Sequence, residues 1–320
     1  MVAGPWLPVL TVLGCVASLI WADVTDHFHQ PPGCQAFFYR GQPPSGFVGF
    51  SQSRLCQRLD GELYYATLYD RSARLPVYSA FRYKYQGEGV PRGKGVDRTW
   101  KYEGQLVDPR SDGNMTALTP AAQRDPAVRR SQAVDGDYPL ELGGVNYVRG
   151  QLNPVNFQGS RPSRSATFAL TNAVPYPRPF HHKSWRPALA RMSARIRLEC
   201  RGFPAFLVSG ATRQRKGPEP WAPPRGKGRA AVPQVLWLTF CCGNGVSGAA
   251  MGHPRAAGRL ALGAVELGPY ETREVSVAQL ETALAAQMGR HSVHVYDGGC
   301  KPTGSEKLPE EKGSVWRSRD

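Results

Sequence analysis

The pattern of hydrophobic and polar positions predicts a protein that is rich in β-strands. Residues 64–69 and 75–81 are dense in aromatic, aliphatic and β-branched side chains, and the polar stretch 70–74 separates them. Two strand-like runs joined by a short polar segment are typical of a hairpin. Shorter apolar runs at 206–210 and 232–242 predict two further strands.

Less regular segments precede and separate these runs. Residues 37–39 read as a short strand that enters a proline-rich turn at 41–46. Residues 86–137 are rich in Gly, Pro, Asp and Arg and predict a long excursion from the sheet. A compact unit follows, in which residues 147–154 lead through a polar loop to residues 166–172.

Helical periodicity appears in two places. In residues 185–200, Leu189, Met192 and Ile196 recur at helix-like spacing among arginines, and residues 275–288 form a second amphipathic pattern. Strands and helices do not alternate as regular βαβ units, and no solenoid-length repeat is visible. The fold class predicted is therefore α+β.

The two ends of the chain differ from the middle. Residues 6–22 form an uncharged apolar run that ends in small residues, which predicts a cleaved signal peptide over 1–22. An uncleaved anchor is the alternative, and no later run is long enough to cross a bilayer. We expect a secreted domain over 23–300 and a disordered tail over 301–320. The sequon at Asn114 agrees with export and marks the expected glycosylation site.

Composition narrows the class of partner. The 320 residues include 40 Lys and Arg against 25 Asp and Glu, a formal charge of +15, and 41% are hydrophobic. That hydrophobic content supports a buried core, whereas 35 Gly and 28 Pro exclude a coiled coil. The excess of positive charge predicts an acidic partner such as nucleic acid, anionic lipid or glycan.

The cysteines of the exported chain predict disulfides. Six remain after the signal peptide, they lack the spacing of a zinc site, and 15 pairings are formally open to them. Adjacent cysteines seldom bridge each other, so the neighbouring pair should face opposite sides of a strand and bond to separate partners. We expect the first two to pair, and the third and the last to bond to the adjacent pair: Cys34, Cys56, Cys200, Cys241, Cys242 and Cys300.

Several separated stretches resemble one enzyme family. The sequence is similar to the DNA/RNA non-specific endonucleases of the His-Me finger, or ββα-metal, superfamily. This resemblance implies a central antiparallel sheet flanked by helices, a strand-loop-helix site, a divalent cation such as Mg²⁺ or Mn²⁺, and a nucleic-acid substrate. The matching stretches run in family order: residues 37–39, 43–46, 66–69, 75–80, 149–154, 166–172, 174–175, Trp185, Trp237 and 241–242.

The resemblance also assigns residues to the catalytic positions. Active members place a histidine after Arg-Gly, where it takes a proton from water; here that position is Gln151. A carboxamide accepts no proton near neutral pH, and loss of a general base typically costs ~10²- to 10⁴-fold in rate. Arg149 and Asn172 match the family pattern. Phosphate binding is therefore expected where hydrolysis is weak or lost.

The positions of the metal ligands depart from the family pattern as well. The resemblance places a metal-binding asparagine four residues before Trp185 and a carboxylate four residues after it, where this chain has His181 and Leu189. Imidazole binds transition metals, so His181 is the candidate metal ligand, and His181 or His182 could serve as a displaced base. Adjacent histidines after a proline-rich segment are more often solvated loop residues, and this is the interpretation that we favour.

A basic segment follows these histidines. Residues 178–201 hold seven Lys and Arg and one Glu, and the loop 213–229 holds six more against one Glu. A phosphate-binding groove is one interpretation, with Arg149, Lys183, Arg186, Arg191 and Arg195 as its candidate contacts. A solvated helix face is the other.

These observations leave three functions open. We favour a secreted nucleic-acid-binding protein with weak or absent phosphodiesterase activity. An active endonuclease that uses His181 or His182 is the first alternative. A non-enzymatic module that binds a glycan polyanion or a protein is the second.

Overall fold

The computed structural model describes residues 24–47, 49, 51–84, 95–138, 141–142, 144–213, 230–296 and 299–300. The expected signal peptide and the expected tail from residue 301 lie outside the described residues. Of the basic loop 213–229, Arg213 is described, and its guanidinium pairs with Asp70 at 3.0 Å.

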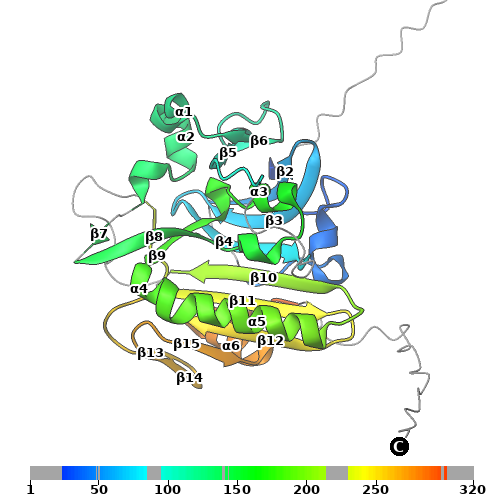
Figure 1. Ribbon diagram of the computed structural model, residues 1–320, viewed down its shortest axis with the longest axis vertical. Helices are drawn as coiled ribbons and strands as arrows, with labels where there is room; N and C mark the ends of the chain where they lie inside the picture. Colours follow the sequence, from blue (N-terminus) through cyan, green and yellow to red (C-terminus); the bar gives the residue numbers. More distant parts are fainter. Residues whose placement is uncertain are drawn as a thin grey trace, which may run out of the picture.

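An eight-stranded antiparallel sheet forms the centre of the molecule (Figure 1). The predicted hairpin is confirmed as two of its neighbouring strands, and the runs 206–210 and 232–242 are confirmed as two more. In spatial order the strands are β1 Val24–Thr25, β2 Gln52–Leu59, β3 Glu62–Asp70, β4 Leu75–Arg82, β10 Ala205–Thr212, β11 Val235–Cys242, β12 Ser247–Gly252 and β15 Thr272–Val275.

Both faces of the central sheet are covered, which explains why β11 reads as a continuous apolar run. Every residue of β11 is buried. Its alternate residues enter two different cores: Leu236, Leu238 and Phe240 pack with α5 (Arg186–Glu199), whereas Trp237 and Cys241 pack with α6 (Val277–Met288). Both helices were predicted, and Figure 1 shows α5 crossing the sheet in front. The arrangement is α+β, as expected.

The segment 37–39 was expected to be a strand, and that prediction is wrong. The chain forms two 3-10 turns there, η1 Cys34–Phe37 and η2 Tyr39–Gly41. A strand sends consecutive side chains to opposite faces. The turns instead bury Phe37, Phe38 and Tyr39 together, each less than 7% exposed, in the core shared with α6.

The predicted excursion contains small elements of its own. Within its described part, a two-stranded sheet and two short helices pack around Leu118, Val128 and Val134. The sequon residue Asn114 bridges this region to the β2–β3 turn, because its side-chain oxygen accepts from the Gly61 backbone at 2.8 Å. The elements are β5 Lys101–Glu103, η3 Gly104–Leu106, β6 Met115–Ala117, α1 Pro120–Arg124, α2 Pro126–Ser131 and η4 Asp135–Asp137.

Three disulfides join distant parts of the chain: Cys34–Cys56, Cys200–Cys242 and Cys241–Cys300. The prediction that the adjacent cysteines have separate partners is confirmed. Cys242 fixes the end of α5 on one face of the sheet, and Cys241 fixes the C-terminal segment on the other.

No helix among the described residues combines the length and the apolar character that crossing a membrane requires.

The remaining small elements are the two-stranded sheet of β13 Leu260–Leu262 and β14 Val265–Leu267, which packs beside α6.

Candidate phosphate-binding site

A strand-loop-strand-helix unit stands beside the central sheet. The strands β8 and β9 pair in antiparallel register, with Gln151 opposite Ala173 and Arg149 opposite Pro175. The close approach of Tyr176 requires glycine at position 150, because a Cβ there would lie about 1.9 Å from the tyrosine hydroxyl. The elements are β7 Glu141–Leu142, β8 Val145–Gln151, η5 Val155–Phe157, α3 Arg161–Ala166, η6 Leu170–Asn172, β9 Ala173–Pro177, α4 Arg178–Phe180, the π-helical turn η7 His181–Trp185, and α5.

A cavity of about 750 Å³ opens between this unit and α5, and we call it the arginine cavity. Five arginines line it and no aspartate or glutamate does. These arginines come from the loop before β5, from β8, from α3 and from both ends of α5: Arg98, Arg149, Arg164, Arg186 and Arg197. Concentrated positive charge in a concave surface favours an anionic ligand.

Arg164 is the most enclosed of these cations. Its side chain belongs to a residue only 8% exposed, and its Nε donates to the Gln158 carbonyl oxygen at 2.9 Å. Among the described residues no carboxylate pairs with its guanidinium. A buried charge without a counter-ion is costly. An anion in the cavity would supply that counter-ion.

Arg149 is held between aromatic rings on one wall of the cavity. Its guanidinium carbon lies 4.3 Å from the ring centre of Trp100 and 4.7 Å from that of Tyr138. The guanidinium also pairs with Asp135, while its Nη1 is buried with no hydrogen-bond partner among the described atoms. Cation–π contact and the ion pair fix its orientation.

Gln151 lines the same cavity with a neutral side chain. Its Nε2 donates both to the carbonyl oxygen and to the hydroxyl oxygen of Thr167, each at 2.9 Å. This amide therefore holds the loop that leads into β9. The expected catalytic position is occupied by a group that fixes backbone and cannot accept a proton near neutral pH.

Asn172 matches the family pattern, but it lies below the cavity and not among its lining residues. It is completely buried and makes four hydrogen bonds. Its Nδ2 donates to the carbonyl oxygens of Asn153 at 3.2 Å and Thr167 at 2.9 Å. Its Oδ1 accepts from the Asn153 backbone at 2.8 Å and from the Ser79 hydroxyl at 3.1 Å. These bonds hold the β8–β9 loop on the central sheet.

His181 is not the solvated loop residue that the proline-rich context favoured. It begins the π-helical turn, is partly buried in the wall of the arginine cavity, and stacks on Tyr176 with ring centres 5.5 Å apart. Burial lowers the pKa of His181, and His182, Arg186 and Arg178 lower it further. Its Nδ1 is buried without a partner in the described structure. His182 is exposed, as expected.

The basic residues of the helix segment 178–201 do not act as one surface. Arg186 reaches the arginine cavity, whereas Lys183, Arg191 and Arg195 are not among its lining residues. Arg191 pairs with Glu274 at 2.9 Å, and Arg195 pairs with Glu199 at 3.0 Å and with Glu274 at 3.3 Å. Their charges are therefore compensated at the junction of α5 with β15.

The donor set of the cavity does not suit the divalent cation that the resemblance implies. Mg²⁺ and Mn²⁺ prefer oxygen ligands, above all carboxylates. The cavity offers His181 and side-chain amides but no carboxylate, and the surrounding guanidinium groups repel a cation. Within the described ranges, no three His, Cys, Asp or Glu residues cluster closely enough to hold a metal ion.

Some of the residues that the sequence singled out lie together in the structure, and others that line the cavity were not singled out. Arg149, Gln151, His181 and Arg186 come together in one cavity. Arg164 and Arg197 were not predicted as contacts. Arg197 belongs to the predicted helix, four residues after Ser193 and eleven after Arg186, so helical spacing alone could have placed it on the same face.

Comparison with known proteins places the sequence in a family. Residues 48–294 match the family described as DNA/RNA non-specific endonuclease. The chain belongs to this family, which confirms the resemblance to the DNA/RNA non-specific endonucleases. Nuclease and hydrolase chemistry is thus the chemistry of its relatives.

Individual relatives are similar over part of their length. The chain is 34% identical to the endonuclease domain-containing 1 protein of Homo sapiens over 223 residues and 32% identical to that of Mus musculus over 224. Each match covers 68% of this chain but 40% of the relative, so this chain spans less than half of those proteins. A chain in a crystal structure of the EndoG/EndoGI complex is 15% identical with a TM-score of 0.40, covering 66% of this chain and 77% of that one.

Proposed function

We propose that this protein binds nucleic acid through the arginine cavity and hydrolyses phosphodiester bonds slowly or not at all. The observation that carries the proposal is the lining of the cavity, where five arginines and no carboxylate face one space. The buried guanidinium of Arg164 points to a bound anion. Family membership supports a phosphodiester as that anion.

Weak hydrolysis follows from the groups that the cavity lacks. Hydroxide is repelled by an anionic phosphodiester, so a local base must generate the nucleophile. Gln151 cannot act as that base, and its amide is engaged with Thr167. The residues of this chain hold a phosphate and orient the nucleic-acid strand, but they leave the attacking water unactivated.

We further propose that the protein is secreted. Three disulfides are typical of an oxidising compartment, and the apolar run at residues 6–22 supports export. Asn114 then becomes the site of glycosylation. Its Nδ2 donates to Asp112 at 2.8 Å, so a glycan would be attached at an ordered turn.

Oligonucleotide titration tests the binding part of the proposal. Wild-type protein should bind labelled single-stranded oligonucleotides of unrelated sequence with similar affinity, and the affinity should fall steeply with salt. Arg164→Gln should weaken binding about tenfold or more, because a charge-assisted contact is lost. Arg71→Gln, in the exposed β3–β4 turn, is the matched control. Salt-insensitive or unaffected binding would contradict the proposal.

Plasmid nicking tests the activity. With Mg²⁺ or Mn²⁺ present, Gln151→His should nick faster than wild type but by no more than about 10²-fold, the low end of the usual range for a general base, because the cavity still lacks a carboxylate for the cation. Rapid nicking by the wild type would overturn the claim of weak hydrolysis.

A second candidate is hydrolysis with His181 as the base, and the partner-free buried Nδ1 in the cavity wall favours it. Its lowered pKa keeps the imidazole neutral and able to accept a proton. In that case His181→Asn should abolish the nicking that remains in wild type, and the matched variant His182→Asn, at an exposed position outside the cavity lining, should leave it unchanged.

A further inference from the structure

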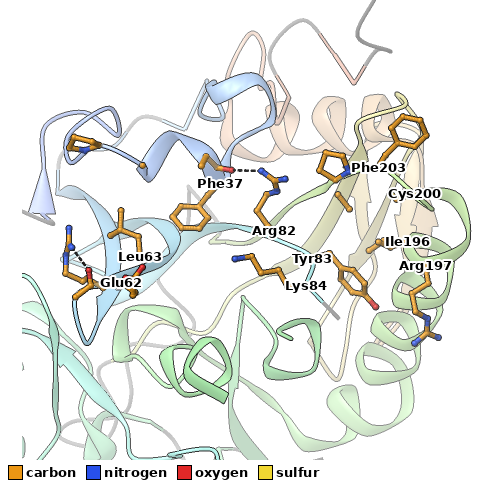
Figure 2. A pocket seen from close by; sticks show the side chains of 17 residues that line it. Phe37, Glu62, Leu63, Arg82, Tyr83, Lys84, Ile196, Arg197, Cys200 and Phe203 are labelled. Carbon is orange, nitrogen blue, oxygen red and sulfur yellow. Dashed lines mark hydrogen bonds between the residues drawn. The ribbon is translucent and has the colours of Figure 1, made fainter. Parts of the chain in front are cut away.

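A second cavity lies at the end of β4 opposite the β3–β4 turn, where the chain leaves the strand after Arg82 and continues through Tyr83 and Lys84 (Figure 2). Its volume is about 980 Å³. It is bounded by the η1 segment, the β2–β3 turn and the last turn of α5 with the residues that follow it. We call it the lysine cavity, after the exposed Lys84 side chain, which Figure 2 shows extending into it.

The two cavities share a wall. Arg197 lines both of them. Tyr83 of the lysine cavity hydrogen-bonds through its hydroxyl to the Ser193 hydroxyl of the arginine cavity at 2.8 Å. The Tyr83 ring also contacts the ring of Phe157, which lines the arginine cavity, with ring centres 5.5 Å apart. Figure 2 shows Tyr83 beside Arg197 and Ile196.

Positive charge continues from one cavity into the other. Four cationic side chains and one carboxylate, that of Glu62, line the lysine cavity. The cations are Arg58, Arg82, Lys84 and Arg197. No carboxylate pairs with Lys84 among the described residues. Arg82 donates to the Ala36 carbonyl oxygen at 3.2 Å. This neutral acceptor does not compensate the charge of the guanidinium. A chain of phosphates leaving the arginine cavity would meet further cations here.

Aromatic rings accompany these cations. The partly exposed Tyr83 and Phe203 both line the lysine cavity. Nucleobases stack on such rings whatever their sequence, whereas the sugars of a sulfated glycan have no π-face to offer. The combination of cations with accessible rings favours a single-stranded nucleic acid over another polyanion.

We infer that the lysine cavity is a second nucleotide-binding subsite, which takes the continuation of a single strand whose phosphate occupies the arginine cavity. This inference rests on the proposed function, since it assumes that nucleic acid binds the arginine cavity. Several consecutive nucleotides, and not one phosphodiester, are then the ligand. Lys84 contacts a phosphate, and the rings of the lysine cavity stack with bases.

The test compares a thymidine trinucleotide, short enough for one cavity, with a thymidine dodecamer, using fluorescence anisotropy at constant salt. Wild-type protein should bind the dodecamer more tightly. Lys84→Glu should weaken dodecamer binding about tenfold or more, reduce its salt dependence, and leave trinucleotide binding within about twofold. Arg71→Glu reverses a charge at the opposite end of β4 and is the matched control. An abasic dodecamer should bind less tightly than the thymidine dodecamer.

The outcomes separate the two proposals. If neither oligonucleotide binds the wild type, the proposed function fails. If both bind but Lys84→Glu matches Arg71→Glu, the second subsite is wrong and the arginine cavity stands. If the abasic dodecamer binds as tightly as thymidine, or heparin of equal charge competes better, the assignment of nucleic acid to the lysine cavity is overturned.

Discussion

Three residues of one short stretch have three different environments. Arg149 lies between two aromatic rings, Gln151 donates to Thr167, and Asn153 is completely buried in the loop. The resemblance singled out this stretch, and Arg149 and Gln151 line the cavity. It could not show that Asn172 lies beneath the cavity, since burial depends on β4 and on the loop around it.

The role of Asn172 can be tested through stability. Asn172→Ala removes four buried hydrogen bonds and leaves the Asn153 backbone N–H without its acceptor. We expect the free energy of unfolding to fall by roughly 2–4 kcal/mol. Urea denaturation measures the change. The exposed Asn156 provides the control, and an equal loss in Asn156→Ala would contradict the structural role.

Nucleic-acid affinity should depend on pH through His181. Burial and neighbouring cations lower the pKa of His181 from its ordinary value of 6.5, so the ring is neutral at pH 7. A phosphate in the cavity stabilises the protonated ring, so binding takes up a proton. The affinity for nucleic acid therefore rises as the pH falls. Anisotropy between about pH 7.5 and 5.5 measures this. His181→Asn should flatten the profile, and the exposed His291 serves as the control position. An unchanged profile in His181→Asn would rule out this linkage.

At the scale of elements, α5 carries two different basic stripes. Arg186, Ser193 and Arg197 face the arginine cavity, whereas Arg191 and Arg195 meet carboxylates of β15 and of α5 itself. The sequence predicts this helix and its density of charge. It does not indicate which stripe pairs with carboxylates of β15, because Glu274 lies about 80 residues further along and is placed by strand pairing.

The two stripes predict opposite mutational results. Arg186→Gln should weaken oligonucleotide binding about fivefold to tenfold, because it removes one of the five cations that line the arginine cavity. Arg191→Gln should leave binding within about twofold and lower stability by ~0.2–1 kcal/mol, since its ion pair with Glu274 is partly exposed. Titration and thermal melts of both variants measure this. Loss of binding in Arg191→Gln alone would contradict the assignment of the stripes.

At the scale of the molecule, the sequence predicts the sheet, its two covering helices and the disulfide pattern. The buried run of β11 and its adjacent cysteines are strong local signals. The turn of Phe37 and Tyr39 was misread, because three adjacent aromatics resemble a strand until the surrounding core is known. Neither cavity could be predicted, since each is enclosed by segments far apart in the sequence.

The disulfides give a test that separates the two faces of the central sheet. Cys200–Cys242 closes a separation of 42 residues and Cys241–Cys300 one of 59, so loss of either should cost ~3–4 kcal/mol on the chain-entropy model. Double alanine variants of each pair should therefore melt at similarly lowered temperatures. Cys200 lines the lysine cavity and holds the end of α5, whereas Cys241 and Cys300 pack on the face of α6.

Binding should distinguish the two variants where melting does not. Well below both melting temperatures, Cys200→Ala with Cys242→Ala should weaken dodecamer binding, because Arg197 lies on the last turn of α5 that this disulfide anchors. Cys241→Ala with Cys300→Ala should bind as the wild type does, since neither cysteine lines either cavity and their bond does not anchor α5. Equal weakening in both variants would show that the loss reflects general loosening of the fold and not the position of α5.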